Sequence, residues 1–182
     1  MKAEKYAIIN TIKPEELKQI RKEFDLSQSE FAKLVGVSKP TIERWESVEE
    51  KIKGPIAVLV NMLSENPAYL KSRIVPEKQM PLRLFYMHKN RVCTLIDVDA
   101  NKEEVLIKNY TNNVMFKAFG INENPTFKDY QEFLKSRCFP ESRDKLKLVL
   151  EDLGLPFYDP FLIIKKTEGR MAEDDFWIKI EE

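Results

Sequence analysis

The chain has 182 residues, of which 43% are hydrophobic and 33% are charged, and it contains 5 glycines. This composition is typical of a folded globular protein and excludes the disordered and fibrous classes. The 30 basic and 30 acidic side chains cancel, so any nucleic-acid-binding surface must come from local clustering of charge. Domains usually contain about 100–150 residues, so the length allows two small domains.

The sequence has no candidate membrane span and no export signal. Its longest apolar runs, such as Ile56–Val60, are far shorter than the roughly 20 residues needed to cross a bilayer. Met1–Asn10 lacks the apolar region and cleavage site of a secretory signal. Cys93 and Cys138 are too few for a disulfide framework. We therefore expect a cytoplasmic protein without membrane association.

The first two helices are predicted from apolar spacing and end signals. Leu17 and Ile20 follow one stripe of a helix that starts at Pro14 and continues to Phe24. The string Ser27–Glu30 has the form of a capping box, which starts a second helix. That helix buries Phe31 and Ala32, and it ends at Gly36 because glycine adopts the left-handed conformation at low cost.

A third helix follows after a short turn. Ser38 is its predicted N-cap, Pro40 lies in its first turn, and Ile42 and Trp45 face inward because they are three residues apart. Two helices joined by a turn of about 3–4 residues that contains glycine are the signature of the helix-turn-helix.

The segment Leu26–Glu46 resembles the Cro/C1-type family, also called the xenobiotic-response-element family. It matches that family's sequence pattern, which runs from Leu-Ser-Gln through Gly-Val-Ser to Thr-Ile-x-x-Trp-Glu. Gly54–Pro67 resembles the fourth and fifth helices of toxin-antitoxin members of the family. The resemblance implies an all-α, five-helix helix-turn-helix domain over residues 1–75.

The resemblance also implies a set of DNA-binding residues. By this resemblance, Gln28 is expected to contact a phosphate, and the third helix is expected to lie in the major groove of double-stranded DNA. Lysines outside that helix are candidates for contacts to phosphates, which fix register without reading sequence. The full candidate set is Gln28, Lys33, Ser38, Lys39, Pro40, Thr41, Arg44, Lys51 and Lys53. The alternative is that the charged side chains of the third helix form an ordinary solvated face.

The predicted DNA-binding domain has a modest positive charge. Residues 1–75 carry thirteen basic and eleven acidic side chains. Specific binding usually needs many phosphate contacts, which proteins of this kind obtain by dimerising on half-sites about 34–36 Å apart. We therefore expect a homodimer that binds a palindromic operator.

Residues 82–182 are predicted to form a small α+β domain after a linker at 76–81, where two prolines in Ile74–Pro81 block a helix. The apolar and β-branched patterns predict three antiparallel strands, two helices and a final strand that returns to the sheet. The strands are at Leu82–Met87, Val92–Val98, Glu104–Asn109 and Asp175–Ile180, and the helices begin near Thr126 and follow Pro140.

No catalytic, cofactor or metal site is predicted. Asp97, Asp99 and Asn101 begin like a calcium loop, but lysines replace its glycine and its final glutamate, so a turn is expected. His88 is the single histidine and is expected to end a strand, and the two cysteines are expected to be buried thiols. No phosphate-binding loop or kinase signature is present. We therefore do not expect an enzyme.

The stretches Cys138–Asp144 and Gly169–Trp177 resemble a small module found with HipA-type toxin systems. This resemblance implies a role in binding a partner. The alternative is a structural core with Arg170 on the surface and solvated carboxylates at Glu173, Asp174 and Asp175.

Two functions remain open at this point. The first is an autoregulating antitoxin of a type II toxin-antitoxin system, in which the first domain binds an operator and the second binds a cognate toxin or another copy. The second is a stand-alone repressor whose C-terminal domain senses a small molecule. The first rests on the motif and on family resemblance, and no sequence feature defines a pocket for the second.

Overall fold

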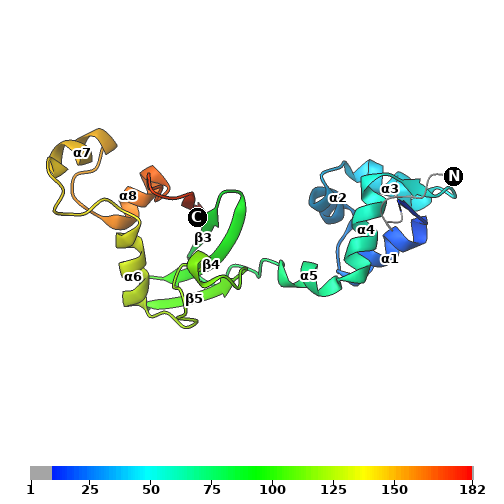
Figure 1. The fold of residues 1–182 in the computed structure, drawn as a ribbon, viewed down its shortest axis with the longest axis horizontal. Helices are drawn as coiled ribbons and strands as arrows, with labels where there is room; N and C mark the ends of the chain where they lie inside the picture. The colour runs from blue at the N-terminus through cyan, green and yellow to red at the C-terminus, as the bar shows by residue number, and fades with distance from the viewer. Residues whose placement is uncertain (1–9, 182) are drawn as a thin grey trace. The chain divides into compact units, whose positions relative to one another are not determined.

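The computed structural model describes residues 10–181 (Figure 1). These residues divide into two compact units, with the junction between Val75 and Pro76. Each unit has its own hydrophobic core, and each is described separately below.

The first unit contains five helices, which confirms the predicted fold class. Their bounds are α1 Pro14–Glu23, α2 Gln28–Val35, α3 Lys39–Ser47, α4 Pro55–Glu65 and α5 Pro67–Ser72. A two-residue antiparallel ladder, β1 (Thr11–Ile12) with β2 (Ile52–Lys53), was not predicted. Its strands are too short to show an alternating pattern in the sequence.

The helices and the ladder of the first unit enclose a single core. Leu17, Phe31 and Ile42 are fully buried, so each of the first three helices turns its predicted apolar face inward. The ladder places Ile12 and Ile52 against this core. The other buried members are Ile20, Phe24, Ala32, Ile56, Ala57, Val60 and Leu63. Trp45 is partly buried at its edge.

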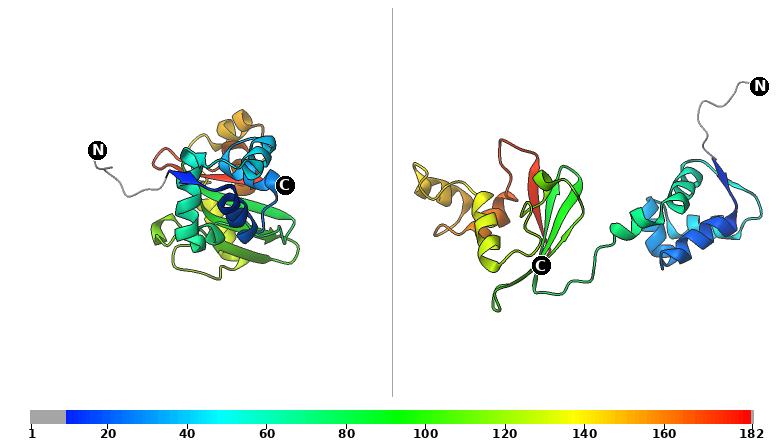
Figure 2. Two further views of the ribbon diagram at one scale, coloured as in Figure 1. Left: turned by 90° about the vertical axis from the view of Figure 1, so that its right-hand side faces the viewer. Right: turned by 60° about the horizontal axis from the view of Figure 1, so that its bottom comes forward.

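The second unit is built on a four-stranded antiparallel sheet, as predicted. Its strands are β3 Leu82–His88, β4 Arg91–Asp99, β5 Glu104–Asn109 and β6 Phe176–Glu181. The order is β5-β4-β3-β6, so the final strand pairs with β3 (Figure 2). His88 ends β3 as expected, and the Asp99 carboxylate accepts hydrogen bonds from the Asn101 and Lys102 amides in the predicted turn.

Helices cover one face of this sheet (Figure 2). After a 3₁₀ turn, η1 (Val114–Phe116), the helices of this unit are α6 Phe127–Ser136, α7 Leu146–Leu153 and α8 Pro160–Thr167, of which α7 extends away from the sheet (Figure 1). α6 and α7 were predicted, whereas α8 was not. Its apolar run is short and continuous, and periodicity alone does not distinguish such a run from a strand. Asp159 begins α8 by accepting a hydrogen bond from the Leu162 amide at 2.8 Å.

The core of the second unit lies between the sheet and these helices. Leu84, Ile96 and Ile178 come from three neighbouring strands and are at most 1% exposed. From the helices come Tyr130, Phe133, Leu134, Leu150, Ile163 and Ile164. Both cysteines are buried with free thiols, as predicted. Burial raises the pKa of the Cys138 thiol to about 12, so this thiol is unreactive at neutral pH.

A buried ion pair joins the sheet to the segment that precedes it. The Arg83 guanidinium donates to both carboxylate oxygens of Asp97, at 2.6 and 2.7 Å. It also donates to the carbonyls of Pro76 and Glu77, and the Gln79 amide donates to Asp97. Residues 76–79 of the predicted linker are therefore bonded to the sheet of the second unit.

A second buried arginine joins the end of α6 to the segment that leads into β6. Arg137 donates to both carboxylate oxygens of Asp174, to the Gly169 carbonyl and to the Phe176 carbonyl. This pairing lowers the pKa of Asp174. Asp174 itself is an exposed residue, in line with the alternative of a surface carboxylate, and its pairing with the buried Arg137 holds the end of α6 against the segment that leads into β6.

Within residues 10–181, none of the helices is both long enough and apolar enough to span a bilayer.

Candidate nucleic-acid interface

The second helix begins and ends at the predicted residues. The Ser27 hydroxyl accepts a hydrogen bond from the Glu30 amide at 3.2 Å, and the Glu30 carboxylate accepts one from the Ser27 amide at 2.7 Å. This capping box fixes the start of α2. Gly36 ends the helix with a left-handed φ of 72°. The N-terminus of α2 carries the positive end of the helix dipole, which favours a phosphate group.

The third helix starts at Lys39 after Ser38, with Pro40 in its first turn. Ser38 is the N-cap residue, as predicted, but its side chain does not cap a backbone amide. Instead, the Ser38 and Thr41 hydroxyl oxygens lie 2.9 Å apart and share a hydrogen bond. The pair leaves one hydroxyl hydrogen available to an outside acceptor such as a phosphate oxygen.

Glu46 ties the three helices of the motif together from the last turn of α3. The Arg21 guanidinium from α1 donates to both of its carboxylate oxygens, at 2.6 and 2.9 Å. Gln28, the first residue of α2, donates to the same carboxylate at 2.9 Å. Arg21 also donates to the Leu26 carbonyl in the α1–α2 turn. This cluster, which we name the Glu46 cluster (Arg21, Gln28 and Glu46), fixes the orientation of α3 on its neighbours.

The Glu46 cluster makes the stability of the first unit depend on pH. Its hydrogen bonds with Arg21 lower the pKa of Glu46 below the usual 4.5. A lowered folded-state pKa contributes stability above the ordinary value, and that contribution is lost as pH falls through the folded-state pKa. We expect Glu46→Gln to destabilise the unit at neutral pH, and we expect the difference from wild type to shrink on acidification. Urea denaturation from about pH 7 down to about pH 3 measures this.

The control for this experiment is Glu23→Gln, which removes an exposed carboxylate from α1. We expect its stability to stay close to that of wild type throughout. If the free energy of unfolding of Glu46→Gln differed from that of wild type by the same amount at every pH, the negative charge of Glu46 would contribute nothing to stability.

Four residues of the candidate DNA-binding set, Lys39, Pro40, Thr41 and Arg44, belong to α3. Lys39, Pro40 and Arg44 are exposed, and Thr41 is half-buried. Ile42 is fully buried on the face of α3 opposite Arg44. Among residues 10–181, no hydrogen-bond or ion-pair partner is found for the Arg44 guanidinium, so its donors are available to an outside ligand.

Lys39 lies in a weak internal ion pair on α3. Its ammonium group is 3.0 Å from the Glu43 carboxylate, one helical turn away, and both side chains are largely exposed. Exposed pairs of this kind are worth about 0.3–0.5 kcal/mol. Lys39 can therefore exchange Glu43 for a phosphate at little cost, and Glu43 can accept a hydrogen bond from a cytosine amino group.

The other residues of the candidate DNA-binding set lie outside α3 and differ in their exposure and partners. Lys33, Lys51 and Lys53 are exposed, on α2, before β2 and in β2 respectively. Gln28 is half-buried, and one of its amide hydrogens is already committed to Glu46. The side-chain amide has two N–H donors, so a phosphate contact from Gln28 would use the second one.

Sequence reasoning did not find the Glu46 cluster. Gln28 and Glu46 both belong to the quoted family string, but the string does not show that they meet. Arg21 is 25 residues from Glu46, and no spacing rule links residues so far apart in sequence. Only the packing of α1 across α3 brings them together.

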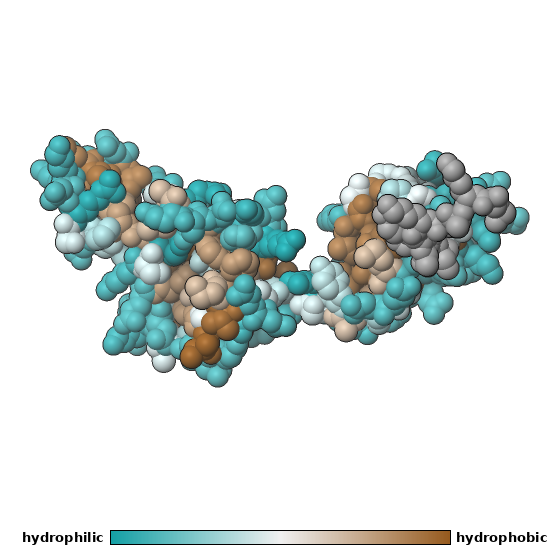
Figure 3. Space-filling view, viewed as in Figure 1, coloured by the Kyte–Doolittle hydropathy of each residue, from teal (hydrophilic) through white to brown (hydrophobic). Residues whose placement is uncertain are grey.

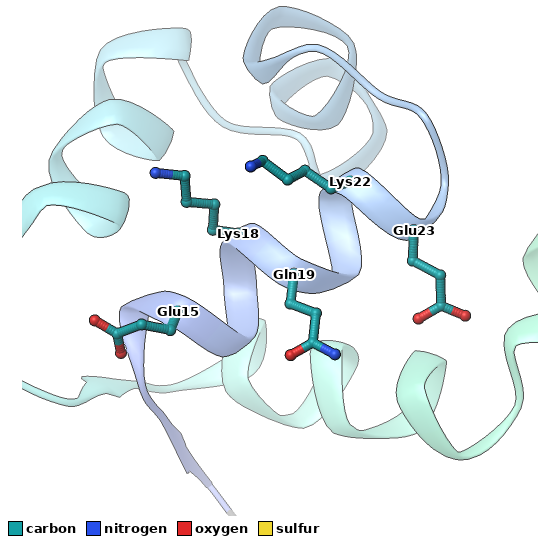
Figure 4. Close-up of a pocket in the computed structure, with 5 residues that line it drawn as sticks. All are labelled: Glu15, Lys18, Gln19, Lys22 and Glu23. Carbon is teal, nitrogen blue, oxygen red and sulfur yellow. The ribbon is translucent and has the colours of Figure 1, made fainter.

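A surface depression of about 520 Å³ lies on α1 of the first unit. It is lined by Glu15, Lys18, Gln19, Lys22 and Glu23. Figure 4 shows these side chains spreading outward from one helix instead of converging on a point. It is an open part of the helix surface and does not have the enclosed, converging geometry of a ligand site.

Comparison with known proteins agrees with this geometry. Residues 17–54 match the model of a helix-turn-helix family. The chain is also similar to an antitoxin, HigA-2 from Vibrio cholerae serotype O1, with 32% identity over 59 residues. The similar segment is 32% of this chain and 57% of that protein's length. No solved structure matches the chain. Residues 17–54 of the first unit are a helix-turn-helix domain of the Cro/C1 type.

Proposed function

We propose that the first unit binds double-stranded DNA in a sequence-specific way, with α3 in the major groove, and that the protein regulates transcription. The observation that carries this proposal is the outer face of α3, where Arg44 is exposed while Ile42, on the opposite face, is fully buried in the core. Arginine binds the O6 and N7 atoms of guanine in a bidentate manner, which is the commonest specific contact in the major groove.

Phosphate contacts would hold α3 in register. We assign them to Gln28 at the N-terminus of α2 and to Lys33, Lys51 and Lys53, which are exposed around the motif. The modest net charge of this unit limits the affinity of one copy, because each neutralised phosphate adds to binding through the release of counterions. We therefore propose that two copies bind a palindromic operator.

We further propose that the protein is an autoregulating antitoxin. The similarity to antitoxin HigA-2 supports this assignment. In this proposal the first unit binds the operator of the protein's own gene, and the second unit binds a cognate toxin or a second copy of the chain.

Footprinting on the DNA upstream of the protein's own gene tests the first half of the proposal. We expect a protected region with two-fold symmetry and half-sites about 34–36 Å apart. Co-purification of the full chain with the product of the adjacent gene tests the second half. Protection without any co-purifying partner would support a DNA-binding regulator and count against an antitoxin.

Lys33→Ala tests the phosphate contacts. Because a phosphate contact carries no sequence information, the variant should weaken binding to all duplexes alike and reduce the salt dependence of log K by roughly one unit. Fluorescence anisotropy over a range of salt concentrations measures both effects. Lys128→Ala, which removes an exposed lysine from α6, is the control. An unchanged salt slope for Lys33→Ala would remove this residue from the interface.

A further inference from the structure

α7 is weakly integrated into the second unit and extends away from the sheet (Figure 1). Leu150 is its one buried side chain, whereas α6 buries three. Leu148, on the opposite side, is 55% exposed. Figure 3 shows hydrophobic atoms among hydrophilic ones in this region of the surface. A helix of eight residues is marginal by itself in water, so its outer face offers apolar area to a partner.

The charges along α7 oppose its own helix dipole. Lys145 is the N-cap, with a left-handed φ of 58° and no side-chain cap, and Lys147 follows in the first turn, whereas Asp144 lies outside the helix. Glu151 and Asp152 lie in the last turn, which contains no basic residue. A basic residue near the N-terminus or an acidic one near the C-terminus is unfavourable in an isolated helix.

These charges also lack ion-pair partners among residues 10–181. Among the described residues, no ion pair is found for Lys145, Lys147, Glu151 or Asp152. Lys147 and Glu151 are one helical turn apart with the lysine first, which is the weaker orientation for such a pair. α7 therefore has a basic end, an acidic end and an exposed leucine between them.

A second copy of the same helix complements this pattern when it runs antiparallel. We propose that α7 docks against α7 of a second copy of this chain, related by a two-fold axis. Lys147 and Glu151 lie on the same flank of the exposed face, so Lys147 of one protomer then faces the glutamate at position 151 of the other copy, and the reverse contact follows from the symmetry. The two Leu148 side chains pack between these charge pairs, and the two helix dipoles run in opposite directions, which is favourable.

The proposed contact is small. A helix of eight residues is about 12 Å long, so a pair of them buries less than the roughly 1,200 Å² of a standard stable interface. Pairing through α7 alone should be weak and sensitive to salt. When both copies are held on one operator, their effective concentration is raised and the weak contact becomes sufficient.

This inference deepens the proposed binding of DNA by two copies, but it is tested without DNA, so that its failure and the failure of operator binding are distinguishable. The test uses sedimentation equilibrium of the full chain at low salt. Lys147→Glu makes the flank formed by residues 147 and 151 acidic, and Glu151→Lys makes the same flank basic. Each variant turns two attractive contacts of the symmetric pair into repulsive ones. We expect each alone to self-associate about tenfold more weakly than wild type.

Mixing the two variants is the decisive measurement. An acidic α7 complements a basic one, so an equimolar mixture should associate within about threefold of wild type. Loss of helix in either variant would not be rescued by mixing, which separates the proposal from a folding defect. A wild-type chain that stays monomeric, or a mixture that associates no better than the single variants, would overturn the proposal. The latter result would assign this face to a different protein.

Leucine variants provide a matched pair of controls. Leu148→Ser removes the apolar centre of the proposed contact and should weaken self-association about tenfold. Leu106→Ser removes a leucine of similar exposure, 47%, from β5, and should leave self-association unchanged. Both positions are exposed, so far-ultraviolet circular dichroism should show wild-type folding. Equal effects of the two substitutions would contradict a specific role for α7.

Discussion

Asp97→Ala should destabilise the second unit by about 3–5 kcal/mol, because it leaves the Arg83 guanidinium buried without its counter-charge. The side chains of this pair are 3% and 4% exposed, so water does not replace the lost carboxylate. The substitution also removes the acceptor of the Gln79 amide. The segment that precedes β3 should therefore loosen together with the sheet.

Each unit contains one tryptophan, which allows the two to be followed separately. Trp177 lies in β6 of the second unit and Trp45 lies in α3 of the first. In a Trp45→Phe background, urea denaturation followed by fluorescence reports the second unit, and Asp97→Ala should move that transition to lower urea. In a Trp177→Phe background, the transition of the first unit should not move.

Two further variants show whether burial is the cause. Asp175→Ala breaks an exposed ion pair with Lys89, whose side chains are 59% and 65% exposed, and should cost less than about 1 kcal/mol. The double variant Arg83→Met with Asp97→Leu replaces both charges and should recover part of the loss, because no buried charge is left unpaired. A cost of Asp97→Ala no larger than that of Asp175→Ala would contradict this account.

Arg44→Ala should weaken binding to the operator by about 1–3 kcal/mol and relax base preference at one position. Arg44 is exposed on the outer face of α3, while the Glu46 cluster and Ile42 hold that helix in place from the other side. The substitution removes donors without disturbing the core, so stability should change by less than about 0.5 kcal/mol.

Anisotropy titrations on the footprinted operator and on a scrambled duplex at the same salt measure this effect. The loss should be large on the operator and small on the scrambled duplex. Lys22→Ala, which removes the same charge from the exposed surface of α1, should affect both duplexes slightly and alike. Equal losses for Arg44→Ala on the two duplexes would show that Arg44 contacts phosphate only.

Much of the fold was predictable because its signals are local. The capping box at Ser27, the left-handed Gly36 and the inward spacing of Leu17 and Ile20 are set by residues within one or two turns of each other, and the structure confirms them. The same holds for the strands of the second unit, including the final strand that returns to the sheet. α8 was missed because its apolar run carries no period that separates helix from strand.

The sequence by itself determined the helix-turn-helix and the identity of its outer residues, because capping, glycine conformation and apolar spacing act over a few residues. Only the tertiary structure decided which charges are shared inside the chain. Glu46 binds Arg21 and Gln28, Asp97 binds Arg83, and Asp174 binds Arg137. These partners lie between 14 and 37 residues apart. Their pairing depends on how helices and strands pack, and no local pattern of residues encodes it.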